Sequence, residues 1–177
     1  MPNDPDTVGD PDTLSGDRLS HWERVMEDMA ATAEEYRERG WDAHEVHPGD
    51  IGLFADEETA GRTGIDLLAP DNEFDPVAEA FDAAGGFENA EVFRADTGST
   101  IFFVVALESP ETETAVLLPA YYSPPEHEGF MDEIYEAGEV RIHVRPLNER
   151  RVLTFVHEDP SLFLPDHGER DGDGSTA

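Results

Sequence analysis

Residues 101–107 form the run IFFVVAL, which constrains the fold more than any other feature of the chain. A strand with one face in water alternates apolar and polar side chains, but this run is apolar at every position. We therefore expect a central strand that is covered on both faces, with helices packed on at least one face of its sheet.

Three stretches predict helices. They span residues 17–39, 75–85 and 123–138. In the first, apolar residues recur every three or four positions. The second is expected to begin with Asp75 as its cap and Pro76 at its first helical position. The third is expected to begin at Ser123, whose spacing to Glu126 resembles a capping box.

Strands are expected near residues 42–46, 65–69, 90–95, 100–107, 114–118, 140–145 and 151–157. Pro119 cannot donate a ladder hydrogen bond, so we expect an edge or a bulge where its strand ends. The sum predicts a single α+β domain, with a largely antiparallel sheet and about three helices packed on it.

The two ends of the chain differ from the rest in composition. Residues 1–16 and 167–177 are rich in Pro, Gly and Asp and lack the large apolar residues needed to form a core. We expect an acidic disordered N-terminal tail, a domain over residues 17–166 and a disordered C-terminal tail.

The charge is strongly one-sided. The chain has 42 Asp and Glu against 11 basic residues, all of them Arg, for a formal net charge of -31. Molar salt screens such repulsion, because the Debye length falls to about 3 Å. Arg also pairs with carboxylates in two places, whereas Lys offers a single hydrated charge. These features indicate an extreme halophile, with an archaeon as the expected source.

The same composition excludes several function classes. No basic face is visible for binding nucleic acid. The apolar runs are far shorter than the roughly 20 residues that span a bilayer, and the N-terminus does not resemble a signal peptide. We expect a cytoplasmic protein. Without phosphate-binding, nucleophile or zinc motifs, we expect no cofactor and no metal.

Residues 96–99 read Asp-Thr-Gly-Ser, as in the catalytic signature of aspartic proteases. Those enzymes need two carboxylates that share one proton, whereas this chain has a single copy and lacks the later apolar-apolar-Gly segment. Asp, Thr and Gly also favour a tight hairpin turn. We therefore predict a turn between two strands and not a protease.

The best candidate site is the basic stretch around residues 141–151. On the expected strand 140–145, three of these side chains alternate with apolar residues and should share one outward face. The candidate residues are Arg141, His143, Arg145 and Arg151, with Tyr121 and Tyr122 nearby. Guanidinium groups there suit a small anion or an acidic partner protein, but they also suit pairing with the chain's own carboxylates. We favour a non-catalytic binding domain; the sequence leaves its oligomeric state open.

An alternative is a small enzyme with a site near His47, Asp50 and Tyr121. A tight turn at residues 47–50 would bring the first two together. His44 and His47 should point to opposite faces of an extended segment, so a shared metal is not expected.

Four short segments carry a family resemblance. They are Gly40-Trp41, Pro48-Gly49-Asp50, GIDLLAP at residues 64–70 and LLPAYY at residues 117–122. In this order and spacing they resemble a family of uncharacterised proteins from halophilic archaea. The resemblance covers about residues 19–165 and implies a single domain; it implies no catalytic residue.

Overall fold

The computed structural model of the chain describes residues 7–9, 11, 14, 16–55, 63–85, 87, 89–97, 99–148 and 150–165. Most of the two expected tails lies outside these residues. Thr7–Gly9, which we expected to be disordered, forms strand β1, and helix α1 begins at Gly16.

The nine strands of the described part form two sheets. The five-stranded sheet has the order β1 (Thr7–Gly9), β3 (Asp50–Phe54), β4 (Gly64–Leu68), β8 (Val140–Arg145) and β9 (Leu153–His157). The four-stranded sheet has the order β2 (Asp42–Glu45), β7 (Thr114–Tyr122), β6 (Thr100–Ser109) and β5 (Asn89–Thr97). Only β4–β8 and β2–β7 pair in parallel. The predicted α+β domain with largely antiparallel pairing is confirmed, and its strands are divided between two sheets.

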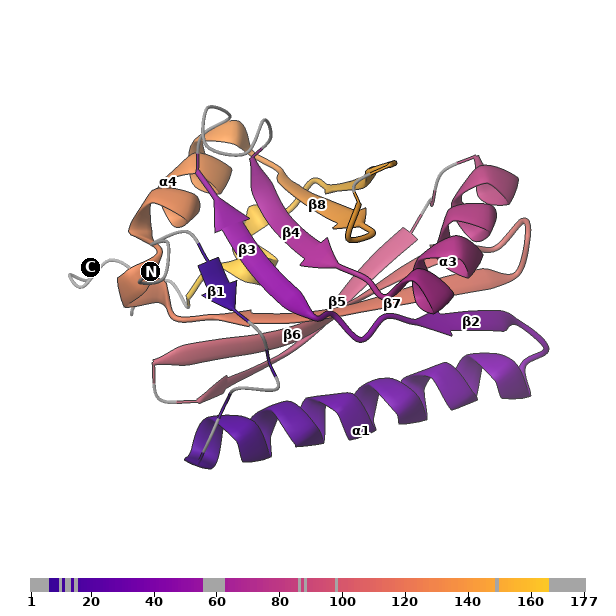
Figure 1. Ribbon diagram of the computed structural model, residues 1–177, viewed down its shortest axis with the longest axis horizontal. Coiled ribbons are helices and arrows are strands. Elements are labelled where there is room, and N and C mark those ends of the chain that lie inside the picture. The colour runs from indigo at the N-terminus through magenta and orange to yellow at the C-terminus, as the bar shows by residue number, and fades with distance from the viewer. Residues whose placement is uncertain are drawn as a thin grey trace.

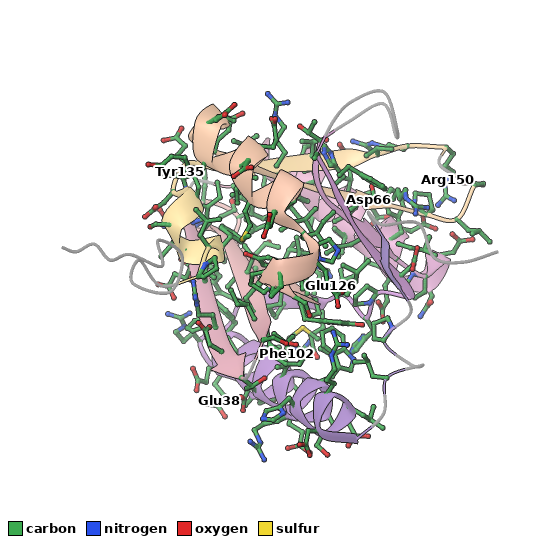
Figure 2. All side chains as sticks on the ribbon, turned by 90° about the vertical axis from the view of Figure 1, so that its left-hand side faces the viewer. Glu38, Asp66, Phe102, Glu126, Tyr135 and Arg150 are labelled. Carbon is green, nitrogen blue, oxygen red and sulfur yellow. The ribbon has the colours of Figure 1, made fainter. Side chains whose placement is uncertain are left out.

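The four-stranded sheet forms the middle layer (Figure 1). Helix α1 (Gly16–Glu38) covers one face, where Trp22 packs edge-on against Tyr121. The five-stranded sheet lies on the other side. Every residue from 101 to 107 is buried, which confirms the predicted covered strand. Side-chain oxygens surround the outline of the molecule, as expected from its charge (Figure 2).

Two further helices lie at opposite ends of the five-stranded sheet (Figure 1). Helix α3 (Asp71–Ala84) begins five residues earlier than predicted, at Asp71 and not at Pro76, and contains Pro76 in its interior. The early turn is stabilised because the buried Phe74 anchors it and donates its N–H to the Pro70 carbonyl. The fixed φ of Pro76 suits a helix, at the loss of one hydrogen bond.

The third predicted helix is divided. Pro124–Glu126 form the 3₁₀ turn η2, and helix α4 spans Glu128–Ala137. The predicted capping box is wrong, because the Ser123 side chain makes no capping hydrogen bond. A second 3₁₀ turn, η3 (Pro160–Phe163), follows β9.

Strand β7 does not end at Pro119, contrary to our expectation. The Leu117 carbonyl accepts a hydrogen bond from Val46, so the backbone of Leu117 faces β2. Two residues on, Pro119 faces the same side, but β2 has already ended at Glu45. The missing N–H of Pro119 therefore removes no ladder bond, and β7 continues along β6.

Candidate functional site

The basic face of β8 is present, but its arginines are paired within the molecule. The Arg145 Nε donates to Asp66 Oδ2 over 2.7 Å, and the Asp66 carboxylate on β4 is only 2% exposed. Arg141 donates to Glu139 over 3.1 Å. Both guanidinium groups thus have a carboxylate partner from the chain itself.

His143 lies on the same face of β8 but is buried at 4% exposure. Its Nε2 lies 2.7 Å from the Thr63 carbonyl, and its Nδ1 lies 3.0 Å from the Thr154 hydroxyl. Because a carbonyl only accepts, Nε2 carries a proton and donates to Thr63, while the Thr154 hydroxyl can either donate to Nδ1 or accept from it. Contrary to our expectation, His143 is therefore a buried side chain with both ring nitrogens hydrogen-bonded, and it does not present a basic group outward.

Arg151 binds the C-terminal part of α3. Its Nη1 and Nη2 donate to the two oxygens of Asp82 over 3.0 and 2.5 Å, and its guanidinium lies 5.9 Å from the Phe81 ring centroid. The hydrogen bonds from Arg151 lower the pKa of Asp82 below its ordinary value and raise the pKa of Arg151.

Arg150 makes the same kind of contact with α3, two helical turns closer to the start of that helix. It donates to Asp75 over 2.6 Å and lies 5.3 Å from the Phe74 ring centroid. The sequence contains the signal for both contacts, because the dipeptide Phe-Asp occurs at residues 74–75 and again seven residues later. We call the contacts of Arg150 and Arg151 with α3 the arginine clasp. The clasp, which we did not predict, holds the β8–β9 connection against α3.

The two tyrosines do not join the arginines at a surface. Tyr121 and Tyr122 are buried and, as neighbours on β7, face opposite sides of the sheet. Tyr121 packs under α1, while the Tyr122 hydroxyl donates to the Phe163 carbonyl.

The alternative site is dispersed in the same way. His47 is exposed, and its Nδ1 lies 2.7 Å from Glu73 Oε2 on α3. Asp50 opens β3, whereas Tyr121 lies in the core beneath α1. In the described ranges, no group of three or more His, Asp or Glu side chains is arranged to hold a metal ion.

The protease-like segment forms the predicted hairpin. Strand β5 ends at Thr97 and pairs there with Thr100, the first residue of β6; Gly98 lies outside the described residues. Arg94 donates to both oxygens of Asp96, over 2.9 and 2.7 Å. A carboxylate held by a guanidinium is a poor partner for sharing a proton, which supports the turn over the catalytic dyad.

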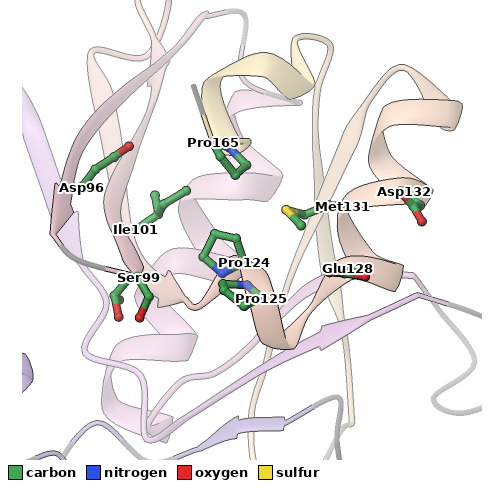
Figure 3. A pocket seen from close by; sticks show the side chains of 10 residues that line it. Asp96, Ser99, Ile101, Pro124, Pro125, Glu128, Met131, Asp132 and Pro165 are labelled. Carbon is green, nitrogen blue, oxygen red and sulfur yellow. The ribbon is translucent and has the colours of Figure 1, made fainter. Parts of the chain in front are cut away.

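A groove of about 640 Å³ lies between the tip of this hairpin and α4, with η2 beside it (Figure 3). Its volume falls within the roughly 300–1,000 Å³ of small-ligand sites. We call it the acidic groove. It is lined by Asp96, Ser99, Thr100, Ile101, Pro124, Pro125, Glu128, Met131, Asp132 and Pro165.

Carboxylates dominate the polar lining of the acidic groove, which contains no basic residue. Glu128 and Asp132 lie one turn apart on α4, and within the described part of the chain neither forms an ion pair or a hydrogen bond. Like charges at this spacing repel each other. Arg94, which neutralises Asp96, also donates to the Leu164 carbonyl over 2.6 Å and so fixes the segment that leads to Pro165.

The chain is a small α+β domain with two stacked sheets and an acidic groove. Residues 12–165 match the family model DUF7529, described as a family of unknown function, so the chain belongs to this family. No curated protein and no solved structure matches the chain. Among the described residues, no helix is both long and apolar enough to cross a membrane.

Proposed function

We propose that the chain is a non-catalytic cytoplasmic domain of a salt-adapted archaeon and that its acidic groove binds a basic segment of a partner protein. The observation that carries this proposal is the pair Glu128 and Asp132, two exposed like charges that have no partner in the described residues. A guanidinium between them would relieve their repulsion and bind both carboxylates. Met131 and the prolines of the groove supply apolar contacts beside the charge.

An anion site at Arg141, Arg145 and Arg151 stays a prediction with weaker support. An anion there would have to displace carboxylates already bound to the arginines: Glu139, Asp66 and Asp82. An enzyme site around His47, Asp50 and Tyr121 is also less well supported, because the Tyr121 ring is buried beneath α1.

The salt-adapted setting determines how such a groove would work. At molar salt the Debye length is about 3 Å, so long-range attraction contributes little. Recognition therefore depends on direct contacts between a guanidinium and carboxylates, and on burial of apolar surface. The lack of Lys and the net charge of -31 support this setting.

A hexa-arginine peptide in molar KCl is a direct probe, with binding measured by calorimetry. We expect Glu128→Gln/Asp132→Asn to weaken binding about tenfold or more, since 1.4 kcal/mol corresponds to a factor of ten. The matched control is Glu23→Gln/Glu27→Gln, which removes two exposed carboxylates at the same spacing from α1.

The proposal is wrong if the groove variant and the control bind the peptide equally well. It is also wrong if a hexa-glutamate peptide binds and the hexa-arginine peptide does not. That second result would favour the arginines of β8 and the β8–β9 connection.

A further inference from the structure

We propose that two copies of this chain associate through strand β5, pairing antiparallel about a two-fold axis at Phe93. This inference concerns the edge of the four-stranded sheet and does not depend on the acidic groove. It rests on three features: the place of β5 at the edge of its sheet in the described part of the chain, the direction of its backbone groups and the side chains that self-pairing would bring together.

Strand β5 is a long and regular edge. It spans nine residues and, within the described part of the chain, pairs only with β6. The pairing continues from Asn89 to Thr97 without a bulge. The other edge strands, β1, β2 and β9, have three, four and five residues. Proteins usually protect edges with Pro, charged side chains, bulges or short strands. Strand β5 has no Pro and no bulge and is long, but it carries three charged residues, Glu91, Arg94 and Asp96, so a partner strand must keep like charges apart.

The register of the sheet determines which backbone groups of β5 face outward. The backbone of Leu117 faces β2, so the alternate residues of β7 face β6. The same alternation across β6 makes the odd-numbered residues of β5 face β6. The even-numbered residues therefore direct N–H and C=O groups to the open edge: Ala90, Val92, Arg94 and Asp96.

A two-fold axis at Phe93 brings these outward-facing groups of the two copies into register. It places Val92 opposite Arg94 of the second copy and Ala90 opposite Asp96, so that outward-facing residues pair with one another. All nine residues of β5 then overlap. Phe93 meets its own copy at a non-hydrogen-bonded position, where Cα atoms approach to about 4.5 Å and side chains are closest.

Charge selects this axis over its neighbours. At Phe93, Glu91 faces Ala95 of the second copy, and no like charges lie directly opposite. An axis at Glu91 or at Arg94 would place two identical charges face to face, which destabilises a strand pair. An axis at Val92 avoids this but leaves two residues of β5, Asp96 and Thr97, without a partner in the strand.

The exposure of Phe93 gives a reason for the association. Its ring is 46% exposed although it lies at the midpoint of β5. It borders a hollow of about 390 Å³ beside Tyr36 and Arg39 of α1. Pairing of two such rings removes apolar surface from water at the axis. Because each copy carries a charge of -31, we expect salt to strengthen the dimer.

The absence of cysteine allows a register-specific test on the full chain. Phe93→Cys would place two sulfurs across the axis with Cα atoms about 4.5 Å apart, within the range of a disulfide. Glu91→Cys would place the two cysteines four residues apart along the strands, about 13 Å, which is too far. In molar KCl under mild oxidation, we expect Phe93→Cys to form covalent dimers and Glu91→Cys to stay uncrosslinked.

Sedimentation equilibrium in molar KCl tests the association without crosslinking. We expect the native chain to show a concentration-dependent dimer and Phe93→Asp to be monomeric. Leu147→Asp, a matched change at an exposed apolar residue of the β8–β9 connection, should leave the dimer intact. A native chain that stays monomeric at all concentrations overturns the proposal. Two further results would overturn it: equal disulfide crosslinking of Glu91→Cys and Phe93→Cys, and a dimer that persists in Phe93→Asp.

Discussion

At the scale of single residues, Asp66 and Arg145 show why an arginine in this chain is not automatically a ligand-binding group. Asp66 is 2% exposed, and the Arg145 side chain is 15% exposed. Removing water from a carboxylate is costly unless a partner compensates for the loss. The two residues lie 79 positions apart in the sequence. The alternation of β8 therefore predicted the face on which Arg145 lies, but not its partner.

We predict that Arg145→Met lowers the free energy of unfolding by about 3 kcal/mol, because it leaves the buried Asp66 without this cation. Arg141→Met should cost less than about 1 kcal/mol, since Arg141 pairs with Glu139 at the surface. Urea unfolding in molar KCl measures both. The double variant Asp66→Asn/Arg145→Met should recover part of the loss. Equal losses for the two single variants would contradict this account.

At the scale of elements, the arginine clasp explains how α3 is held against the β8–β9 connection. Arg150 and Arg151 each combine an aromatic ring with an adjacent carboxylate on α3. Direct hydrogen bonds persist in salt better than distant charge interactions do, because screening acts mainly beyond the Debye length. The clasp is therefore suited to a protein that folds in concentrated salt.

The clasp predicts the titration of Asp82. Its folded pKa is lowered by Arg151, so this contribution to stability is present above the ordinary value of 3.8 and is lost as the pH falls through the folded pKa. We expect Arg151→Gln to raise the pKa of Asp82 towards 3.8, as measured by carbon NMR of its carboxyl group. The matched control is Arg150→Gln, which leaves the contact between Arg151 and Asp82 in place and should not change the Asp82 titration. An unchanged Asp82 titration would show that the hydrogen bonds do not persist in solution.

Local patterns predicted much of the element content and little of its assembly. The covered strand at residues 101–107 and the hairpin at residues 96–99 could be predicted, because the conformation of each is determined mainly by residues adjacent in the sequence. Strand β3 was missed because Gly52 weakens its local strand signal, and its stability comes from pairing with β1 and β4. The acidic groove was missed because the hairpin, η2, α4 and Pro165 meet only in the folded chain.

At the scale of the whole molecule, internal pairing of the arginines leaves a surface dominated by carboxylates. The chain has 42 acidic residues and 11 arginines. Even if every arginine paired with two carboxylates, about half of the acidic side chains would have no arginine partner. Self-repulsion among the remaining charges therefore opposes the compact state, and dissolved ions must reduce it.

The most direct test is the free energy of urea unfolding, measured at fixed pH from dilute buffer to molar KCl. We predict that it rises continuously with KCl and that NaCl at equal ionic strength acts alike, because screening depends on ionic strength. A chain that unfolds cooperatively and with undiminished stability in dilute buffer would contradict the account.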